Sequence, residues 1–441
     1  MTPAARIASA AEALGGIAHA RESGGPAADV LLGRFFRTRR YAGAKDRRAI
    51  RDLVYAVLRR QGELDARLAA SGLPAGTTNR LLLALLLAEG RLEESWFGGP
   101  HGLPPPGEAA RAALHRAAAL PASVLPQAAR LSLPDWALAG LAHRFGEALA
   151  AEAAGWEMQA PIDLRVITAR TSREGLLQAL AGAGVAAGPT PFSPVGLRIA
   201  GRLARGRLKP FLDREAILQD EGSQLAALLV DARPGMTVVE LGAGGGGKTA
   251  ALADMMADHG RIVAADIDNR RLARARARLG RLGFSCVDWL ALPDDEAKAA
   301  ELLAPSRRRA DRVLVDAPCS GSGTWRRNPD LKWRWRAADV VAFARRQRAL
   351  LARALELAAP HPQARVVYVT CSLLPEENEE VVESVLAAHP GWALADWRGI
   401  AGAQHWPRMP ESAALIREAL QLAPARHGTD GLFVAVLQRR L

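Results

Sequence analysis

Thr237-Val238-Val239-Glu240-Leu241 leads directly into Gly242-Ala243-Gly244-Gly245-Gly246-Gly247-Lys248-Thr249, and this stretch decides the fold class of the second half of the chain. The first five residues predict a short buried strand, the glycines predict a tight loop whose backbone can approach a ligand closely, and a helix is expected from Thr249. Three further strands are expected, at Arg261–Asp266, Arg312–Asp316 and Arg365–Thr370. Strands that alternate with helices predict a mostly parallel, doubly wound α/β sheet, which binds ligands outside the carboxyl ends of its strands.

The glycine loop fits two classes of ligand. Gly242 to Thr249 satisfies the phosphate-binding pattern G-x-x-x-x-G-K-[ST], and Asp316 at the end of an apolar strand could then hold magnesium, as in a P-loop NTPase. However, Glu240 would repel a phosphate but could accept a hydrogen bond from an ammonium or hydroxyl group. Asp266, at the end of the next strand, suits ribose hydroxyls. Two such carboxylates favour a nucleoside with an amino-acid tail, so the NTPase is kept as the alternative.

Two of the three cysteines lie at the ends of predicted strands. Cys319 follows Arg312–Asp316, Cys371 directly follows Thr370, and a serine comes after each. If these strands are neighbours, their tips lie about 5 Å apart and both thiols open into one cleft. Cys286 has no matching position and is interpreted as structural. An odd, sparse number of cysteines indicates a reducing compartment rather than a disulfide framework.

A pair of thiols beside an acid suits one particular reaction. A thiolate that adds to C6 of a pyrimidine makes C5 able to attack an electrophilic methyl group, and thiolates are accessible near neutral pH. An acid near N3, for which Asp316 is placed, would stabilise the developing charge. A second thiolate can then remove the C5 proton so that the first can leave. The residues alone permit either cysteine to attack.

The composition bounds the number of domains and the partners. With 441 residues, of which 49% are hydrophobic, the chain is expected to form two or three domains. Its net charge of +12 favours a polyanionic partner. Neither an apolar run long enough for a membrane span nor a leader-like pattern is seen, so we expect a cytoplasmic protein without a membrane anchor, and we expect no metal site.

Basic residues gather in two regions that could contact nucleic acid. Residues 34 to 60 contain ten lysines or arginines, and this cluster is equally compatible with a solvated helix face. Residues 323 to 348 contain eight, interleaved with Trp325, Trp333 and Trp335. Because basic side chains neutralise phosphates and aromatic rings stack on bases, the second cluster predicts RNA contact, although some of its tryptophans are expected in the core.

The first half of the chain predicts helices followed by a small α/β module. Residues 1 to 125 show apolar residues at helical spacing, most clearly from Ile50 to Leu58, and residues 98 to 107 are a loop by their glycines and prolines. The module is expected to contain, in order, a helix over Ala137–Ala154, a strand over Ile162–Thr168, a helix over residues 173–184 and a loop over Gly188–Pro194.

Three runs of residues together resemble a known family. Asp316–Ser320, Arg326–Trp333 and Thr370–Asn378 look like motifs of the NOL1/NOP2/Sun RNA cytosine-C5 methyltransferases, in particular the Sun/Fmu (RsmB-like) branch; Gln219–Gln224, Asp430–Ala435 and, more weakly, Asp46–Arg59 agree. The resemblance implies an α/β fold with three parts. These are a NusB-like, all-α RNA-binding domain over 1–128, an RNA-recognition-motif-like α/β module over 129–215, and a class I (Rossmann-like) methyltransferase domain over 216–441.

The resemblance also assigns roles to the site residues. It implies that Cys371 is the nucleophile, that Cys319 promotes release, and that Asp316 and Lys248 line the region of the target base and methyl transfer. It implies S-adenosylmethionine as cofactor, with contacts at Glu240, Gly242, Ala243, Gly244, Gly245, Gly246, Lys248, Asp266, Asp288 and Asp316. The family usually has Asp where Glu240 stands and often Pro or Ala where Gly245 stands. Asp288 is chosen for the acid of the third strand from the irregular run Ser285–Leu290, with Asp294 as substitute.

The resulting hypothesis is transfer of a methyl group from S-adenosylmethionine to C5 of cytosine in RNA, with small-subunit rRNA as the expected substrate and a monomer as the expected state. A DNA target is disfavoured, because DNA enzymes attack with the Pro-Cys cysteine and lack a Thr-Cys-Ser partner. Besides the P-loop NTPase, a second alternative is a non-catalytic RNA-binding factor of ribosome assembly that retains a vestigial methyltransferase fold.

Overall fold

The computed structural model describes residues 1–201 and 205–440, which divide into two compact units. The helical unit comprises Met1–Ala142, Gly146–Gln159 and Thr324–Arg336. The α/β unit comprises His143–Phe145, Ala160–Gly323 and Ala337–Leu441. A short segment of the second half of the chain, Thr324–Arg336, therefore belongs to the unit built mainly from the first half.

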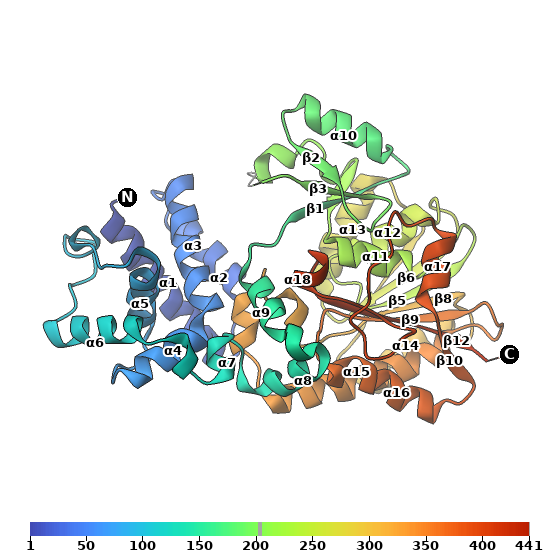
Figure 1. The fold of residues 1–441 in the computed structure, drawn as a ribbon. Coiled ribbons are helices and arrows are strands. Elements are labelled where there is room, and N and C mark those ends of the chain that lie inside the picture. The colour runs from blue at the N-terminus through green and yellow to red at the C-terminus, as the bar shows by residue number, and fades with distance from the viewer. Residues whose placement is uncertain (202–204, 441) are drawn as a thin grey trace. The chain divides into compact units, whose positions relative to one another are not determined.

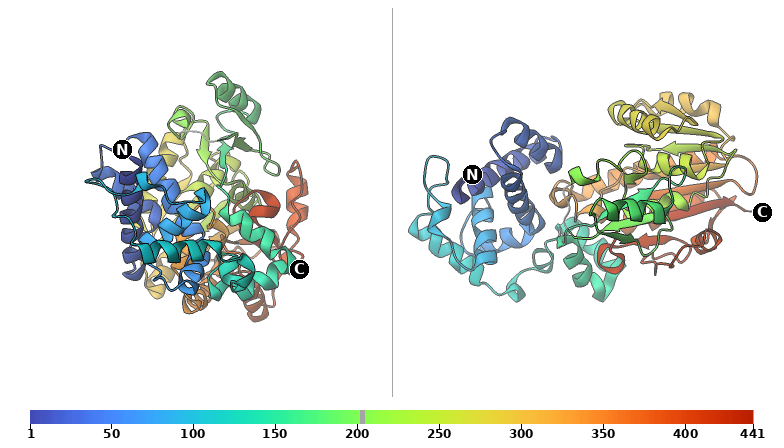
Figure 2. Two further views of the ribbon diagram at one scale, coloured as in Figure 1. Left: turned by 60° about the vertical axis from the view of Figure 1, so that its left-hand side comes forward. Right: turned by 90° about the horizontal axis from the view of Figure 1, so that it is seen from above.

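The helical unit confirms the all-helical prediction for the N-terminal region (Figures 1 and 2). Its α-helices are α1 (Pro3–Glu22), α2 (Ala28–Thr38), α3 (Ala44–Arg59), α4 (Gln61–Ala70), α5 (Thr77–Glu89), α6 (Glu108–Ala119), α7 (Gln127–Arg130), α8 (Asp135–Phe145) and α9 (Leu149–Glu157), and its short 3-10 turns include η1 (Glu94–Trp96), η2 (Ala122–Val124), η3 (Gly146–Ala148) and η7 (Pro329–Trp333). The stripe expected on α3 is buried, with Ile50, Val54 and Val57 almost fully covered. The single helix expected over Ala137–Ala154 is wrong, because Gly146 takes a positive φ of 51° and ends α8.

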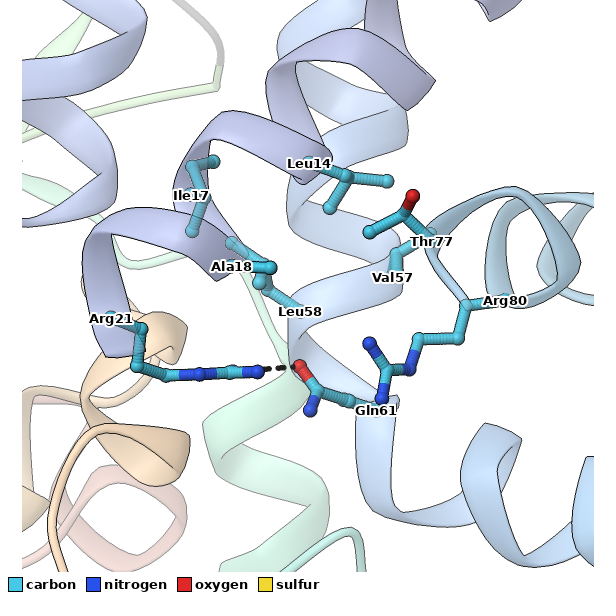
Figure 3. Close-up of a pocket in the computed structure, with 9 residues that line it drawn as sticks. All are labelled: Leu14, Ile17, Ala18, Arg21, Val57, Leu58, Gln61, Thr77 and Arg80. Atoms are coloured by element: carbon cyan, nitrogen blue, oxygen red, sulfur yellow. Dashed lines mark hydrogen bonds between the residues drawn. The ribbon is translucent and has the colours of Figure 1, made fainter. Parts of the chain in front are cut away.

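A small cavity lies inside the helical unit between α1, α3 and α5 (Figure 3). Its volume is about 10 Å³, the size of one water molecule. Arg21 and Gln61 point into it, and Nη1 of Arg21 donates a hydrogen bond of 3.1 Å to Oε1 of Gln61. Burial lowers the pKa of Arg21 below its usual value. A space this small holds no organic ligand.

The α/β unit begins with a small antiparallel sheet. Its strands are β1 (Ile162–Val166), β2 (Ala187–Pro189), β3 (Gly196–Ile199) and β4 (Ala216–Leu218), in the order β2-β3-β1-β4, with α10 (Arg173–Gly182) and the turn η4 (Arg205–Leu208). The loop expected over Gly188–Pro194 is partly wrong, because its first residues pair with β3 as β2. The charged residues of β1 are also buried: Arg165 donates a 2.7 Å bond to Asp254, which anchors the small sheet to the larger part of the unit.

The larger sheet is the doubly wound sheet predicted from the sequence. Its strands are β5 (Thr237–Leu241), β6 (Arg261–Asp266), β7 (Val287–Ala291), β8 (Arg312–Asp316), β9 (Arg365–Thr370), β10 (Trp392–Ala395), β11 (Leu420–Leu422) and β12 (Leu432–Arg439). Their order is β10-β12-β9-β8-β5-β6-β7, with β11 paired to β12. Strands β5 to β9 are parallel, and β12 runs antiparallel to β9. The four predicted strands of this region are confirmed, but the run Ser285–Leu290 is not irregular, since most of it forms β7.

Helices cover both faces of this sheet, as Figure 1 shows. They are α11 (Glu221–Leu228), α12 (Gly247–Met255), α13 (Asn269–Leu282), α14 (Glu296–Leu303), α15 (Ala337–Leu357), α16 (Glu379–Ala388), α17 (Trp397–Ala403) and α18 (Pro424–His427), with the turns η5 (Ala304–Ser306), η6 (Ser322–Thr324) and η8 (Pro375–Glu377). Val238 of β5 packs with α11 and α12 on one face, and Val239 packs with α15 and α16 on the other. Such two-sided burial explains the continuous apolar character of the strands.

Within the described residues, no helix is long and apolar enough to cross a membrane. The same residues contain no group of three or more histidine, cysteine or acidic side chains arranged to hold a metal ion.

Candidate active site

The glycine loop joins β5 to α12, and its geometry requires glycine at particular positions. Gly242, Gly244 and Gly246 have positive φ angles of 86°, 56° and 74°. A Cβ atom at Gly242 would lie 2.3 Å from the carbonyl oxygen of Asp316, and one at Gly246 would lie 2.8 Å from Cβ of Ala275. At Gly245, in contrast, no described atom lies within 4 Å of the Cβ position. Of the two residues at which this stretch departs from the family, Glu240 and Gly245, the second therefore stands where an added side chain would meet no described neighbour.

Asp266 is fixed against the glycine loop. Its Oδ2 accepts a 2.7 Å hydrogen bond from the backbone N–H of Gly244, and its Oδ1 accepts one of the same length from the N–H of Asp268. Only 8% of the residue is exposed. Each carboxylate oxygen keeps a further lone pair, so hydroxyl groups of a ribose could still donate to it.

Glu240 is fully buried at the end of β5. Its Oε2 accepts a 2.6 Å bond from the hydroxyl of Thr249, whereas its Oε1 has no hydrogen-bond partner among the described residues. Burial raises the pKa of Glu240 to about 7, against the lowering effect of the bond from Thr249. A buried acceptor without a partner is costly, and a ligand that donates a hydrogen bond would satisfy it. The loop and these two carboxylates therefore fit a ligand with hydroxyl and amino groups.

Lys248 and Asp316 form an ion pair beside the loop. Nζ of Lys248 lies 2.8 Å from Oδ2 of Asp316. Burial alone would lower the pKa of Lys248, but the neighbouring Asp316 raises it above the usual value. Because this lysine is paired with an acid, and Thr249 donates to Glu240, the two side chains that would bind phosphate and magnesium in a P-loop are both engaged elsewhere. This geometry disfavours the NTPase alternative.

The two strand-end cysteines meet as predicted. β8 and β9 are adjacent, with Asp316 opposite Val369, and Sγ of Cys319 lies 3.3 Å from Sγ of Cys371. The hydrogen bond to Cys371, followed by burial, raises the pKa of Cys319 well above the usual value of a thiol; the charges of Cys371 and Glu377 act in the same direction.

The third cysteine lies elsewhere, at the edge of β7. The backbone N–H of Cys286 donates to Asp258, and burial together with this acid raises the pKa of its thiol to about 12. A thiol with this pKa does not ionise near neutral pH and gives no nucleophile.

Asp288 is not brought to the site. It lies in the middle of β7 opposite Val263, is exposed, and forms an ion pair of 2.7 Å with Arg261. The residue of β7 opposite Asp266 is Ala291, which carries no acid. Asp294 follows the end of β7 but is exposed and pairs with Arg346 at 2.7 Å. The acid expected on the third strand therefore has no counterpart at the strand tip.

Two side chains near the site were missed at the sequence level. The guanidinium of Arg271 lies over the glycine loop, 2.7 Å from where a Cβ of Gly244 would stand. Glu377 is fully buried behind the cysteines and accepts hydrogen bonds from Ser320 and Ser372, the residues that follow them. Arg271 lies on α13, the helix after β6, and Glu377 lies in the Thr370–Asn378 motif. Their positions in the sequence do not show that they lie near the site, and only the structure does.

The expectation that the tryptophan-rich cluster contacts RNA is wrong for Trp325, Arg326 and Lys332, which are buried. Trp325 is fully buried in the helical unit and packs edge-on against Trp136 and Trp156. Lys332 is also fully buried and donates to the carbonyl oxygens of Arg59 and Ser132. Arg326 is buried in the same unit, whereas Trp333 and Arg334 are half-buried, and Nε1 of Trp333 donates a 2.7 Å bond to the carbonyl oxygen of Leu58. The buried side chains belong to the core of the helical unit, whereas Trp335 is half-buried and Arg336, Arg345 and Arg346 are exposed, so RNA contact stays a prediction for these residues.

In the basic cluster of residues 34 to 60, six of the ten basic side chains are exposed, unlike the buried Arg326 and Lys332. Its exposed cations lie on α2, α3 and the loop between them: Arg34, Arg37, Arg40, Lys45, Arg48 and Arg51. This surface stays a predicted RNA contact.

Comparison with known proteins agrees with this geometry. A family model described as "16S rRNA methyltransferase RsmB/F" matches residues 227–438, and a second, described as a ferredoxin-like domain of the same proteins, matches residues 133–204. A probable ribosomal RNA small subunit methyltransferase B from Synechocystis is 31% identical over 313 residues, which cover 70% of this chain and 67% of that protein.

The chain belongs to the RsmB/F family. A small subunit methyltransferase B from Pseudomonas syringae is 32% identical over 70% of this chain and 66% of its own length. The matches thus span about two thirds of these relatives.

Solved structures share the fold. PH0851 superposes with a TM-score of 0.76 over 100% of this chain and 99% of its own, at 24% identity. A methyltransferase homologue from Pyrococcus horikoshii superposes with a TM-score of 0.59 over 73% of this chain and 100% of its own, at 27% identity. The Rossmann-like methyltransferase fold and the use of S-adenosylmethionine as cofactor are confirmed by this membership, and the NTPase alternative is excluded.

Proposed function

We propose that this RsmB/F family member methylates C5 of cytosine in RNA, with small-subunit rRNA as substrate, through a covalent bond between Cys371 and C6 that Cys319 helps to resolve. The observation that carries the proposal is the 3.3 Å separation of the two thiols at neighbouring strand ends, beside the Lys248–Asp316 ion pair. One thiol that attacks C6 and a second within reach of C5 are what this chemistry requires.

The charges around the two cysteines support an unequal division of labour. A thiolate at Cys371 raises the pKa of Lys248, so the Lys248 ammonium and Cys371 attract one another. The negative charge of Glu377 instead acts on Cys319, where it opposes ionisation. The attack on C6 is therefore assigned to Cys371, which interacts with the Lys248 ammonium, while Cys319, whose pKa is raised, begins with its proton. This physical difference agrees with the roles that the family resemblance implies.

The contact between Cys319 and Cys371 also supports a route by which Cys319 becomes the base that removes the C5 proton. The hydrogen bond and the charge of Cys371 are two of the causes that keep the pKa of Cys319 high. Once Cys371 is bonded to C6 it carries no charge, so these two causes no longer raise the pKa of Cys319, whereas burial and the charge of Glu377 still do. The lower pKa makes it easier for Cys319 to release its proton to solvent. Its thiolate then accepts the C5 proton, the C5–C6 double bond re-forms, and the Cys371 thiolate leaves. One proton is released in total, which balances a transfer from a sulfonium donor.

The residues of the cofactor loop would hold S-adenosylmethionine, which supplies an electrophilic methyl group when bound. Asp266 is placed for the ribose hydroxyls, and the free Oε1 of Glu240 is placed to accept a hydrogen bond. Asp316, paired with Lys248, would face N3 of the target base and stabilise the charge that develops there. Asp288 and Asp294 are both exposed and paired with arginines, so neither is proposed as a cofactor contact.

The test uses the full chain, radiolabelled S-adenosylmethionine and 16S rRNA that lacks cytosine-C5 methylation. The wild type should incorporate methyl groups at C5. Cys319→Ala should accumulate a denaturant-resistant protein–RNA adduct without turnover, and Cys371→Ala should give neither adduct nor product. No incorporation by the wild type into naked rRNA or small subunits would instead support a non-catalytic assembly factor, and the reverse pattern of adducts would overturn the assignment of the two thiols.

A further inference from the structure

Glu377 connects the two loops that carry the cysteines. It lies in η8, is fully buried, and its Oε2 accepts 2.5 Å hydrogen bonds from the hydroxyls of both Ser320 and Ser372. Its Oε1 accepts a 2.8 Å bond from the backbone N–H of Ser320 and a longer bond of 3.3 Å from Gln347. Each of these serines directly follows a cysteine, so one carboxylate sets the distance between the two loops.

The neighbours of Glu377 suit a carboxylate rather than an amide or an alkyl group. All four contacts come from groups that can donate a hydrogen bond, and an ionised carboxylate is an acceptor only. Gln347 is itself held by its second contact, a 2.9 Å bond to the carbonyl of Pro318, the residue before Cys319. A carboxylate therefore supports the Cys319 loop on both sides of the thiol, directly at Ser320 and through Gln347 at Pro318.

The charge of the same carboxylate opposes ionisation of Cys319, and burial raises the pKa of Glu377 itself above its usual value. Glu377 is among the charges that oppose ionisation of Cys319, whereas Lys248 is the charged side chain that attracts a Cys371 thiolate. Tyr368 of β9, whose hydroxyl donates 2.7 Å to the carbonyl of Glu377, is the other titratable group near Cys319, and its pKa is raised well above the usual value by burial. The tyrosine therefore stays neutral wherever the enzyme would work.

We propose that Glu377 is a positioning residue of the methyl-transfer site, which holds the Cys319 and Cys371 loops together and, by its charge, keeps the proton on Cys319 so that Cys371 alone attacks the base. This inference rests on the proposed function and deepens it, because it explains why two adjacent thiols do not compete as nucleophiles. Glu377 acts through the cysteines and has no role in contacting RNA or cofactor.

The test isolates Cys319 in a Cys371→Ala background and measures its rate of alkylation by iodoacetamide between pH 6.5 and 9. Adding Glu377→Gln keeps the side-chain shape but removes the charge, so the pH profile of alkylation should move to lower pH and the rate at pH 7.5 should rise about tenfold, which corresponds to one pKa unit. Glu380→Gln in the same background is the matched control, because Glu380 is exposed on α16 and has no contact with either loop; its profile should stay in place.

A second readout follows the covalent bond to RNA. Cys371→Ala should form no adduct, whereas Cys371→Ala/Glu377→Gln should form one through Cys319, which peptide mapping identifies. A merely structural role of Glu377 could lower activity but could not create this adduct. Unchanged alkylation together with no adduct in the double variant overturns the inference. Thermal melting checks that each variant folds. Glu377→Asp restores the charge, so it should return the alkylation profile towards that of the Cys371→Ala variant, even if the shorter side chain lowers turnover.

Failure of the inference is distinguishable from failure of the proposed function. If the wild type does not methylate and Cys319→Ala forms no adduct, the proposed function fails. If both of these behave as proposed but Glu377→Gln leaves Cys319 as slow to alkylate as before, only the role of Glu377 fails.

Discussion

Replacing Lys332 with methionine separates a core role of the 324–336 segment from an RNA-binding role. Lys332 is fully buried in the helical unit, and burial lowers its pKa from 10.5 to about 8, with the charge of Glu157 acting in the opposite direction. In the unfolded chain the ammonium returns to water and regains its ordinary pKa. Between pH 8 and 10.5 the unfolded chain therefore binds a proton that the folded chain has released.

The free energy of unfolding of the wild type should therefore rise with pH. Below pH 8 both states are protonated and the folded protein carries the full cost of a buried ammonium, a shift of 2.5 pKa units or about 3 kcal/mol. As the pH rises above 8, this cost is relieved, and the wild type should gain about 2.5 kcal/mol between pH 7 and 10. Lys332→Met removes the titrating group, so it lacks this gain.

The assay is urea unfolding at pH 7, 8, 9 and 10 for the wild type, Lys332→Met and Lys45→Met. Lysine 45 is exposed on α3 in the same unit, so its variant should follow the wild type at every pH. The difference in unfolding free energy between wild type and Lys332→Met should grow in favour of the wild type by about 2.5 kcal/mol over this range. Parallel pH profiles, or a loss of RNA affinity without any change in stability, would refute the burial of Lys332.

Three further predictions concern the site. Gly242→Ala should abolish binding of S-adenosylhomocysteine in calorimetry, because its Cβ would lie 2.3 Å from a backbone oxygen, whereas Gly245→Ala should bind within about twofold of the wild type. Asp266→Asn should weaken cofactor binding at least about tenfold, and Asp288→Asn should leave the dissociation constant unchanged; equal effects would contradict the assigned positions. Cys286→Ala should retain methyl transfer at the wild-type rate, and a loss of activity in a folded Cys286→Ala variant would show that this thiol takes part in the reaction.

The sheet and the meeting of the cysteines could be predicted because they depend on local pattern. Apolar runs such as Val313–Val315 predict strands that are buried on both faces. Parallel strands bring their carboxyl ends to the same edge of the sheet. Cys319 and Cys371, 52 positions apart in sequence, therefore had to meet if β8 and β9 were neighbours. The glycine loop was predictable for the same reason, since positive φ angles at Gly242 and Gly244 leave few other residues possible.

Other features could not be predicted because they depend on which surfaces pack together. Asp288 was chosen from the run Ser285–Leu290 as the acid of the third strand, but in the structure it is exposed and pairs with Arg261. Ile162–Thr168 was predicted as a strand, but its pattern does not reveal that Arg165 is buried against Asp254. Basic and aromatic residues around Trp325 have the composition of an RNA-binding surface, and only the packing of Trp136 and Trp156 around that ring identifies them as core.

The helical unit combines the N-terminal helices with the distant segment Thr324–Arg336, which is synthesised much later. Trp325 and Lys332 fill its interior, but they follow Gln159 by more than a hundred and fifty residues. A ribosome that adds about 5–20 residues per second needs roughly 10 to 35 seconds to pass from residue 159 to residue 336. During that interval the N-terminal helices have their own apolar core, formed by residues from Ile7 to Ala117, but lack the side chains of Trp325 and Lys332. A fragment that ends near residue 160 is therefore expected to leave Trp136 and Trp156 without the ring of Trp325 that packs against them.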